Sequence, residues 1–431
     1  MLSKEPYKGT RDFYPEDQFV HNHIFGVIRR VVEGFGYQEY NAPMLEETAL
    51  YAAKTGEEIV GEQTYSFTDR GDRQVTMRPE MTPSFARMIA RKRHELAFPA
   101  RWYSIPNLWR YERPQRGRLR EHWQLNVDIA GVNSIHGELE VITTAVDIMR
   151  GLGAKDDEFE VRINSRRFVE AFFADILGLD ETRAYRLAKL IDKKAKISEE
   201  QFAEQGRSIV GTPLYPLFAS CMEAGSIDEL CRILPLEFAT HPSIQELGDL
   251  FALLGQGGVG NARFDPTIMR GFDYYTGVVF EVFDKHPDNN RAMFGGGRYD
   301  GLVGIFGVEP ISCVGIAMGD VTAYNFLEVR GLLPKYESNA KLYLSTGPGA
   351  TFEEVWAMAV QLRGEGIAVC VELDNRKLEK QLKAADKLAV PYIAVIGGDE
   401  VASGMLKLKS LTSGAITEIG LKDLPAFLQK N

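Results

Sequence analysis

The sequence predicts an α+β protein in which an antiparallel sheet with flanking helices is followed by a separate, smaller α/β domain. Strand-like segments dominate the chain up to about residue 165 and return with "GVVFEVF" and "FGGGRYDGL". Between them, residues from about 165–250 have helical spacing and few strand formers, which indicates a helical insertion. After a linker at 331–338, short β-branched strands alternate with helices. The expected domains are therefore 1–330 and 339–431.

Composition and charge fit a soluble globular chain. At 431 residues there is material for two or three domains, and 45% hydrophobic and 26% charged residues are ordinary values. No signal-like apolar run and no 18-residue apolar stretch occurs, so we expect a cytoplasmic protein without a membrane segment. The four cysteines form no CxxC pair, which predicts reduced thiols and no metal site. The formal net charge of −10 means that an anionic ligand must be met by local basic patches.

The first domain begins with an amphipathic helix at 15–35, and strands are expected in "QVTMRPE", "ARWYSIPNLWRYER" and "HWQLNVDIAGV". In the last segment Gln124 and Asp128 lie on a polar face that alternates with an apolar one. The same alternation in "VTMRPE" places Thr76 and Glu80 together. Polar faces of this kind indicate either a bound ligand or a solvated sheet surface, and the pattern alone does not separate the two.

The segment "RYERPQRGRLR" at 110–120 holds five arginines in a chain that has more acidic than basic residues. Its Pro and Gly predict a hairpin-like loop. Arginine offers a planar fork that grips phosphate or carboxylate through two hydrogen bonds. The loop is therefore interpreted as an anion-binding element, with an exposed turn as the alternative.

Two further segments carry groups suited to binding a substrate. "IMRGFDYYTG" places Arg270 before a glycine and adds the hydroxyls of Tyr274 and Tyr275. The three glycines of "FGGGRYDGL" permit either a tight turn or close approach of the backbone to a substrate. Neither a Walker loop nor a Rossmann fingerprint is present.

In the C-terminal domain, basic side chains recur along one predicted helix at spacings of four, three and four: Arg376, Lys380, Lys383 and Lys387. A lysine-rich helical face is commonly just solvated. The alternative is a surface for a phosphate backbone.

Together these segments resemble histidyl-tRNA synthetase, a family of class II aminoacyl-tRNA synthetases. The resemblance implies a class II catalytic domain with a helical insertion and an α/β anticodon-binding domain. It runs nearly from end to end, and its last two catalytic stretches match the histidine-specific motifs. The stretches that carry it are "KGTRDFYPED", "YQEYNAPMLEETALY", "MRPEMTPSFAR", "WRYERPQRGRLREHWQLNVDIAG", "RGFDYYTGVVFE", "GGGRYDGLV" and "RKLEKQLKAADKLAVPYIAVIGGDE".

The resemblance also implies roles for individual residues. Arg110 and Arg270 are the implied catalytic residues, with Arg270 bridging the histidine carboxylate and the ATP α-phosphate. The implied histidine pocket comprises Thr76, Glu80, Gln124, Asp128, Tyr274 and Tyr275. The implied ATP site comprises Arg110, Glu112, Arg118 and His122. Implied tRNA contacts are Arg116, Arg376, Lys380, Lys383 and Lys387.

The implied reaction is the activation of L-histidine by ATP with Mg²⁺, followed by transfer to tRNA(His). The implied assembly is a homodimer through "YNAPMLEETALY". One alternative is a histidine-binding paralogue such as the regulatory subunit of ATP phosphoribosyltransferase, which resembles a synthetase that lacks the C-terminal domain. Another is a sensor of uncharged tRNA, but such modules belong to longer kinases, and no kinase motif occurs here.

Two positions depart from the family pattern. The third class motif usually carries an arginine three residues after a glycine, but Thr322 stands there after Gly319. One expected ATP anchor is therefore missing. In addition, His122 occupies a position where many relatives have a phenylalanine stacked on adenine.

Overall fold

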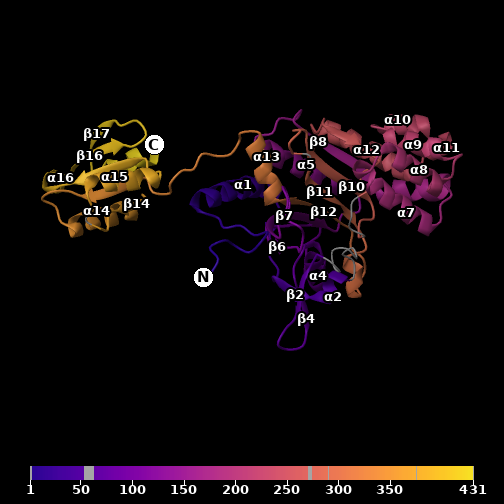
Figure 1. Cartoon of the computed structure of the whole chain (residues 1–431), viewed down its shortest axis with the longest axis horizontal. Coiled ribbons are helices and arrows are strands. Elements are labelled where there is room, and N and C mark those ends of the chain that lie inside the picture. The colour runs from indigo at the N-terminus through magenta and orange to yellow at the C-terminus, as the bar shows by residue number, and fades with distance from the viewer. Residues whose placement is uncertain (1, 53–62, 270–273, 290, 375, 431) are drawn as a thin grey trace. The chain divides into compact units, whose positions relative to one another are not determined.

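A computed structural model describes residues 2–52, 63–269, 274–289, 291–374 and 376–430. The chain divides into two compact units, Met1–Leu333 and Pro334–Asn431. Each unit has its own sheet and its own hydrophobic core, and Figure 1 shows the elements of both.

The first unit is built on a nine-stranded sheet with the order β1-β5-β7-β12-β11-β10-β8-β9, and β6 pairs with β7. The central pairs are antiparallel, as the sequence predicted, whereas the outer pairs β1–β5 and β8–β9 are parallel. The strands are β1 Gln38–Glu39, β5 Ala100–Ser104, β6 Asn107–Trp109, β7 Glu121–Ala130, β8 Phe159–Ser165, β9 Ala262–Phe264, β10 Val278–Asp284, β11 Ala292–Tyr299 and β12 Cys313–Gly319.

Helices α1 (Pro15–Gly34), α5 (His136–Gly151) and α13 (Asp320–Val329) flank this sheet, with α5 against β12 and α1 against both other helices. In α1 the buried residues Ile24, Ile28 and Val32 recur every four positions, which forms the apolar stripe of an amphipathic helix. These side chains join Leu125 and Val127 of β7 in one continuous core. The core therefore holds one face of the sheet and leaves the other available for a site.

A smaller sheet, β2-β4-β3, lies beside the large one, with β2 Leu45–Glu47, β3 Tyr65–Thr68 and β4 Gln74–Met77. Helix α2 spans Thr48–Ala52, and α4 spans Thr82–Lys92. Strand β4 ends at Met77, where the buried Arg78 donates to the backbone carbonyls of Ala42 and Asn107. The chain thereby leaves the small sheet and enters α4 through Glu80.

The insertion between β8 and β9 is helical in the described chain. It comprises α6 Arg166–Ala171, a π-helical turn Phe172–Ile176, α7 Glu181–Asp192, a 3₁₀ turn Lys194–Lys196, α8 Glu199–Val210, α9 Tyr215–Glu223, α10 Ile227–Ile233, α11 Leu236–Ala239 and α12 Pro242–Gln256. Ser198 and Asp180 cap α8 and α7 by accepting backbone N–H bonds, which satisfies donors that a helix start leaves unpaired. Figure 1 shows these helices grouped beyond β8 and β10.

The second unit is a five-stranded sheet in the order β14-β13-β15-β16-β17. Its first three strands are parallel and the last two are antiparallel, so a βαβ arrangement continues into a hairpin. Its elements are β13 Leu342–Thr346, α14 Phe352–Gly364, β14 Val369–Val371, α15 Leu378–Lys387, β15 Tyr392–Ile396, α16 Gly398–Ser403, β16 Met405–Ser410, β17 Ile416–Gly420 and α17 Leu424–Lys430. In the part of the chain that the structure describes, no helix has the length and apolarity needed to cross a bilayer.

Candidate active site

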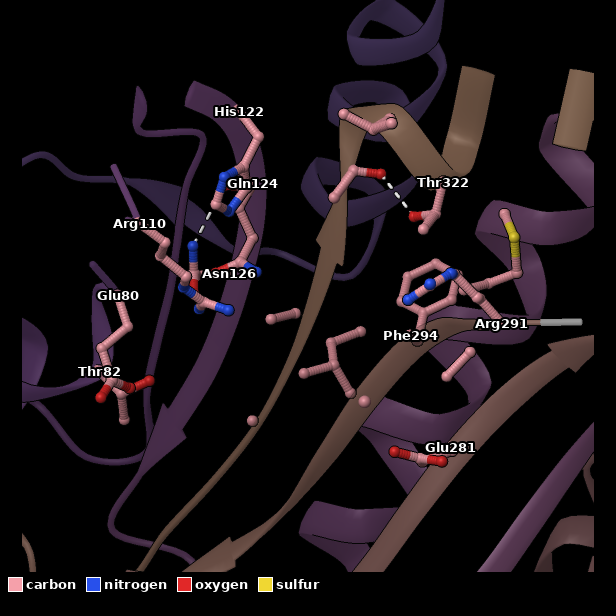
Figure 2. A pocket seen from close by; sticks show the side chains of 18 of the residues that line it. Glu80, Thr82, Arg110, His122, Gln124, Asn126, Glu281, Arg291, Phe294 and Thr322 are labelled. Carbon is pink, nitrogen blue, oxygen red and sulfur yellow. Dashed lines mark hydrogen bonds between the residues drawn. The ribbon is translucent and has the colours of Figure 1, made fainter. Parts of the chain in front are cut away.

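A polar cavity of about 320 Å³ lies in the first unit. Figure 2 shows two of its walls. Glu80, Thr82, Arg110 and Gln124 lie on one side, and Arg291, Phe294 and Thr322 on the other. The lining therefore comes from the start of α4, the loop before β7, β7 itself, β11 and the start of α13. These segments are far apart in the sequence, and the antiparallel sheet brings them together.

Strand β7 supplies the polar side chains of the cavity by strict alternation. His122, Gln124, Asn126 and Asp128 all line it. The intervening Leu125, Val127 and Ile129 are buried in the core on the opposite face. Asn126 donates a hydrogen bond to the carbonyl of Gln124 at 3.1 Å, which orients its amide. The polar face predicted from the sequence is thus a cavity wall rather than a solvated surface.

Glycines allow the neighbouring strands and side chains to come close at the cavity floor. A Cβ atom on Gly315 of β12 would lie 2.1 Å from Asp128 Oδ1, and one on Gly296 of β11 would lie 2.2 Å from the Gly315 carbonyl oxygen. Both distances are impossible for real atoms, so any larger residue would displace Asp128 or the strand. The glycines of "FGGGRYD" lie inside β11, so they serve close approach and not a turn.

One end of the cavity is a set of buried carboxylates and phenols. Tyr274 donates to Glu80 Oε2 at 3.1 Å, and Tyr299 donates to Asp128 Oδ1 at 2.5 Å. Burial raises the pKa of Asp128 to about 7, although the Tyr299 hydrogen bond acts in the opposite direction. In the described part of the chain, Asp128 Oδ2 is buried without a hydrogen-bond partner. This end can therefore accept a hydrogen bond from a small polar ligand.

The arginine-rich segment forms the hairpin that the sequence predicted. Arg110 N donates to Arg120 O at 2.8 Å, and Gln115 and Arg118 exchange backbone hydrogen bonds at the tip. Gly117 has a φ of 78°, which a tight turn of this kind needs and which glycine adopts without strain. Arg110 Nε donates to Pro79 O at 2.8 Å, while Arg118 pairs with Glu112 at 3.0 Å. The hairpin thus holds cationic groups at the cavity mouth.

His122 faces the cavity from β7 beside this hairpin. Burial is the main cause that lowers its pKa, to about 3, and the nearby Arg110 and Arg11 act in the same direction. The imidazole is therefore neutral at physiological pH. A neutral ring can stack on another aromatic group without adding charge.

The opposite wall begins at Gly319, where β12 passes into α13. Asp320 accepts from Arg11 at 2.6 Å and from the backbone N–H of Trp123 at 3.1 Å, which fixes the start of α13 against β7. Thr322 lines the cavity one turn further on, and Glu281 lines it from β10.

The described structure brings together Glu80, Gln124, Asp128, Tyr274 and Tyr275 with Arg110, Glu112, Arg118 and His122. Thr76 is not among the lining residues, because β4 ends at Met77 and the Thr76 hydroxyl contacts Ser66 and Thr48 in the small sheet. Thr82, which the sequence analysis missed, lines the cavity instead; it follows Glu80 in "RPEMT". The predicted Arg270 lies outside the described residues.

The residues predicted to contact tRNA lie on both units. Arg116, at the hairpin tip, is 3.7 Å from Glu328 and largely exposed. Arg376 precedes α15 and donates to both carboxylate oxygens of Glu372, so it does not continue the helical row. Lys380, Lys383 and Lys387 are exposed on α15, and Lys383 pairs with Glu379 at 2.8 Å.

The architecture is that of a class II aminoacyl-tRNA synthetase catalytic domain with a separate anticodon-binding domain. Residues 9–321 match the profile of the family described as Histidyl-tRNA synthetase, and residues 342–431 match the Anticodon binding domain. The chain therefore belongs to the histidyl-tRNA synthetase family, which confirms the resemblance inferred from the motifs.

Curated relatives named histidine--tRNA ligase align over nearly the whole length. The protein of Leptospira biflexa is 43% identical, with 96% of this chain and 94% of the relative covered. The protein of Thermoplasma volcanium is 36% identical, with 99% of each covered. A crystal structure of histidyl-tRNA synthetase from Nostoc sp. PCC 7120 has the same fold, with a TM-score of 0.85 at 23% identity and complete coverage of both chains. The apo synthetase of S. aureus gives a TM-score of 0.73 at 25% identity, covering 99% of this chain and 100% of that one.

Proposed function

We propose that the protein is a histidine--tRNA ligase, which converts L-histidine and ATP into histidyl-adenylate and pyrophosphate and then transfers histidine to the 3′ end of tRNA(His). One observation carries the proposal: a single cavity joins buried hydrogen-bond acceptors at Glu80 and Asp128 to the cationic hairpin of Arg110 and Arg118. The histidine imidazole and amino groups suit the first end, and a triphosphate suits the second.

Activation requires a carboxylate oxygen of histidine to attack the α-phosphorus while the bond from that phosphorus to the pyrophosphate oxygen breaks. Both reactants are anionic, so preorganised cations are needed where charge develops. Arg110 is assigned to the α-phosphate because its Nε hydrogen bond to Pro79 O fixes the guanidinium at the cavity. Arg270 is assigned to the carboxylate and α-phosphate on the strength of the "RGFDYYTG" motif alone.

Histidine selection is assigned to the buried end. A neutral imidazole has one donor and one acceptor. A buried carboxylate such as Asp128 therefore binds a ligand with a ring N–H more tightly than one whose side chain lacks that donor. Gln124, Thr82 and Tyr275 complete the polar lining of this region. An amino acid without a matching donor would leave Asp128 Oδ2 unpaired in the closed site, which is costly.

Mg²⁺ is proposed to enter with ATP and to neutralise part of the triphosphate charge. Among the described residues, no group of three or more His, Cys, Asp or Glu side chains could hold a metal ion alone. Glu281 lies in the cavity wall and can provide one carboxylate oxygen. This fits Mg²⁺, which commonly binds through one or two carboxylates together with substrate phosphates.

A homodimer is proposed through residues 40–51, the segment that resembles the first class motif. It contains β2 and all of α2 except its last residue, Ala52, and its Leu45 is 45% exposed. Sedimentation should give a dimer at assay concentrations, and a fully active monomer would refute this assignment.

The cytoplasm is the proposed location, in keeping with four free cysteines.

The paralogue alternative is less favoured. A crystal structure of an ATP phosphoribosyltransferase regulatory subunit/histidyl-tRNA synthetase from Bacillus halodurans C shares the fold, with a TM-score of 0.73 at 24% identity. This chain matches the anticodon-binding domain over residues 342–431, which the regulatory subunit is expected to lack.

Amino-acid-dependent exchange between ATP and pyrophosphate, measured with all twenty amino acids, tests the proposal. Exchange with histidine alone is expected; exchange with none would favour a regulator.

A further inference from the structure

Position 322 cannot supply the positive charge that the third class motif usually provides. Thr322 lines the cavity, but its hydroxyl donates to the Gly319 carbonyl at 2.8 Å within the first turn of α13. The hydroxyl proton is therefore used inside the helix. A site for the phosphate tail of ATP would lack one cation on this wall unless another residue provides it.

Arg291 reaches the same wall from the segment that leads into β11. A Cβ atom added to Gly117 would lie 2.8 Å from Arg291 Cδ and 3.3 Å from Arg291 Nε, so the side chain crosses directly over the arginine-rich hairpin. The same point is 3.8 Å from the Asn325 amide nitrogen, one turn along α13 from Thr322. Figure 2 shows Arg291 and Thr322 on the same side of the cavity.

The Arg291 guanidinium is also available for a ligand. Arg118 is paired with Glu112, and Arg110 is held by Pro79 O. Within the described ranges, by contrast, no ion pair or hydrogen bond joins Arg291 to another residue. Arg291 is only partly exposed. A partly buried guanidinium without a carboxylate partner is costly to keep, which indicates an anionic ligand.

We propose that Arg291 binds the phosphate tail of ATP and replaces the cation that is absent at Thr322. Its place over Gly117, next to Arg118, puts it at the hairpin end of the cavity and away from the Glu80–Tyr274 pair. The position of Arg291 depends on glycine at 117, because a side chain there would collide with Arg291 and would also strain the turn. The inference rests on the proposed function to the extent that this cavity binds ATP.

Direct binding of ATP and AMP by calorimetry separates this role from a structural one. Arg291→Ala should weaken ATP binding by about ten- to hundredfold, the usual range for a hydrogen bond to a charged group. The Kd for AMP should be nearly unchanged, because AMP lacks the β- and γ-phosphates. Arg291→Lys should recover part of the ATP affinity as a point charge without the planar fork. Arg73→Ala, which removes an exposed arginine from the β3–β4 turn, is the matched charge control.

A second-site variant sharpens the test. Thr322→Arg in the Arg291→Ala background should restore part of the missing ATP affinity, because it returns the cation to the wall that Arg291 serves. Unchanged ATP affinity in Arg291→Ala would overturn the inference. So would an equal loss for ATP and AMP together with a lower melting temperature. A wild-type protein that does not bind ATP would overturn it too. Tight, Arg291-dependent ATP binding without histidine-dependent exchange would support this inference and refute the ligase assignment instead.

Discussion

At the end of the cavity that holds Glu80 and Asp128, the polar groups are about 3% exposed and are bonded to Tyr274 and Tyr299. At the hairpin end, Arg118 has a side chain 52% exposed. The buried end is fixed by neighbours that cannot move without opening the core. If the hairpin end binds the phosphates of ATP, as proposed, it needs only enough positive charge nearby, so different positions can supply that charge. The departures from the family pattern, Thr322 and His122, both line the cavity, and neither belongs to the buried carboxylate end.

The largest expected effect comes from the cation assigned to the reacting centre. Arg270→Ala should reduce histidine-dependent pyrophosphate exchange by at least about 10²–10³, the usual loss when a preorganised donor to developing charge is removed. Arg270→Lys should restore only part, since a point charge cannot bridge carboxylate and phosphate together. Transfer from preformed histidyl-adenylate should suffer less. Equal losses in activation and transfer would contradict the role.

At the buried end, Asp128→Asn should raise the KM for histidine by about ten- to hundredfold and leave the KM for ATP near its wild-type value. Because burial raises the pKa of Asp128 to about 7, the wild-type carboxylate forms only as the pH rises through this value. The wild-type KM for histidine should therefore fall more steeply between pH 6 and 8 than that of Asp128→Asn. Parallel pH profiles would show that Asp128 does not contact the substrate.

As the pH rises, ionisation of Asp128 should improve histidine binding but lower the stability of the fold. The carboxyl of Asp128 ionises at a higher pH in the folded chain than in the unfolded chain. Its favourable contribution is fully present at pH values below the unfolded pKa and is lost as the pH rises through about 7. Asp128→Asn should accordingly melt at a higher temperature than the wild type at pH 8, as expected for a residue kept for function. A lower melting temperature at pH 8 would mean that burial is outweighed by hydrogen bonds to the carboxylate.

The second unit offers an intermediate effect that leaves both ends of the cavity intact. Charge reversal of Lys380, Lys383 and Lys387 should weaken tRNA binding. The slope of log affinity against log salt should fall by about one for each lysine that no longer binds a phosphate. Exchange should remain normal because it needs no tRNA. Reversal of the exposed Lys407, Lys422 and Lys430 on the same unit is the control. Equal salt slopes in the two triple variants would show that Lys380, Lys383 and Lys387 form only a solvated face.

The smallest effect is expected at His122. His122→Phe should change the KM for ATP by less than about tenfold, since stacking contributes on the order of 1 kcal/mol. The low pKa of His122 keeps it neutral, so ATP binding by the two proteins should share one pH profile from pH 5 to 8. A wild-type profile that changes near pH 6 while His122→Phe stays flat would refute the neutral imidazole.

The sequence was sufficient for features that depend on local periodicity. The alternation in β7 predicted the placement of Gln124 and Asp128, and the Pro and Gly of the arginine-rich segment predicted its hairpin. It was less informative where the chain leaves a strand. The alternation grouped Thr76 with Glu80, whereas the Thr76 hydroxyl contacts Ser66 and Thr48 in the small sheet, because counting every second residue cannot show that β4 ends at Met77. The sequence pattern also placed Arg376 on the same helical face as the lysines of α15, although that helix begins at Leu378.

Arg291 was beyond reach for a different reason. It contacts the hairpin only because β11 and β12 stand between β10 and β7, and this order is a property of the whole sheet. The β16–β17 hairpin, in contrast, had a usable signal in "MLKLKS", where Leu406 and Leu408 are buried and alternate with lysines.

Transfer of labelled histidine to tRNA tests the central assignment most directly. The full chain, incubated with ATP, Mg²⁺, labelled histidine and total tRNA, should charge tRNA(His) alone, and Asp128→Asn should need more histidine to reach the same rate. Histidine binding without any charged tRNA, under conditions in which a known synthetase charges the same tRNA, would contradict the account.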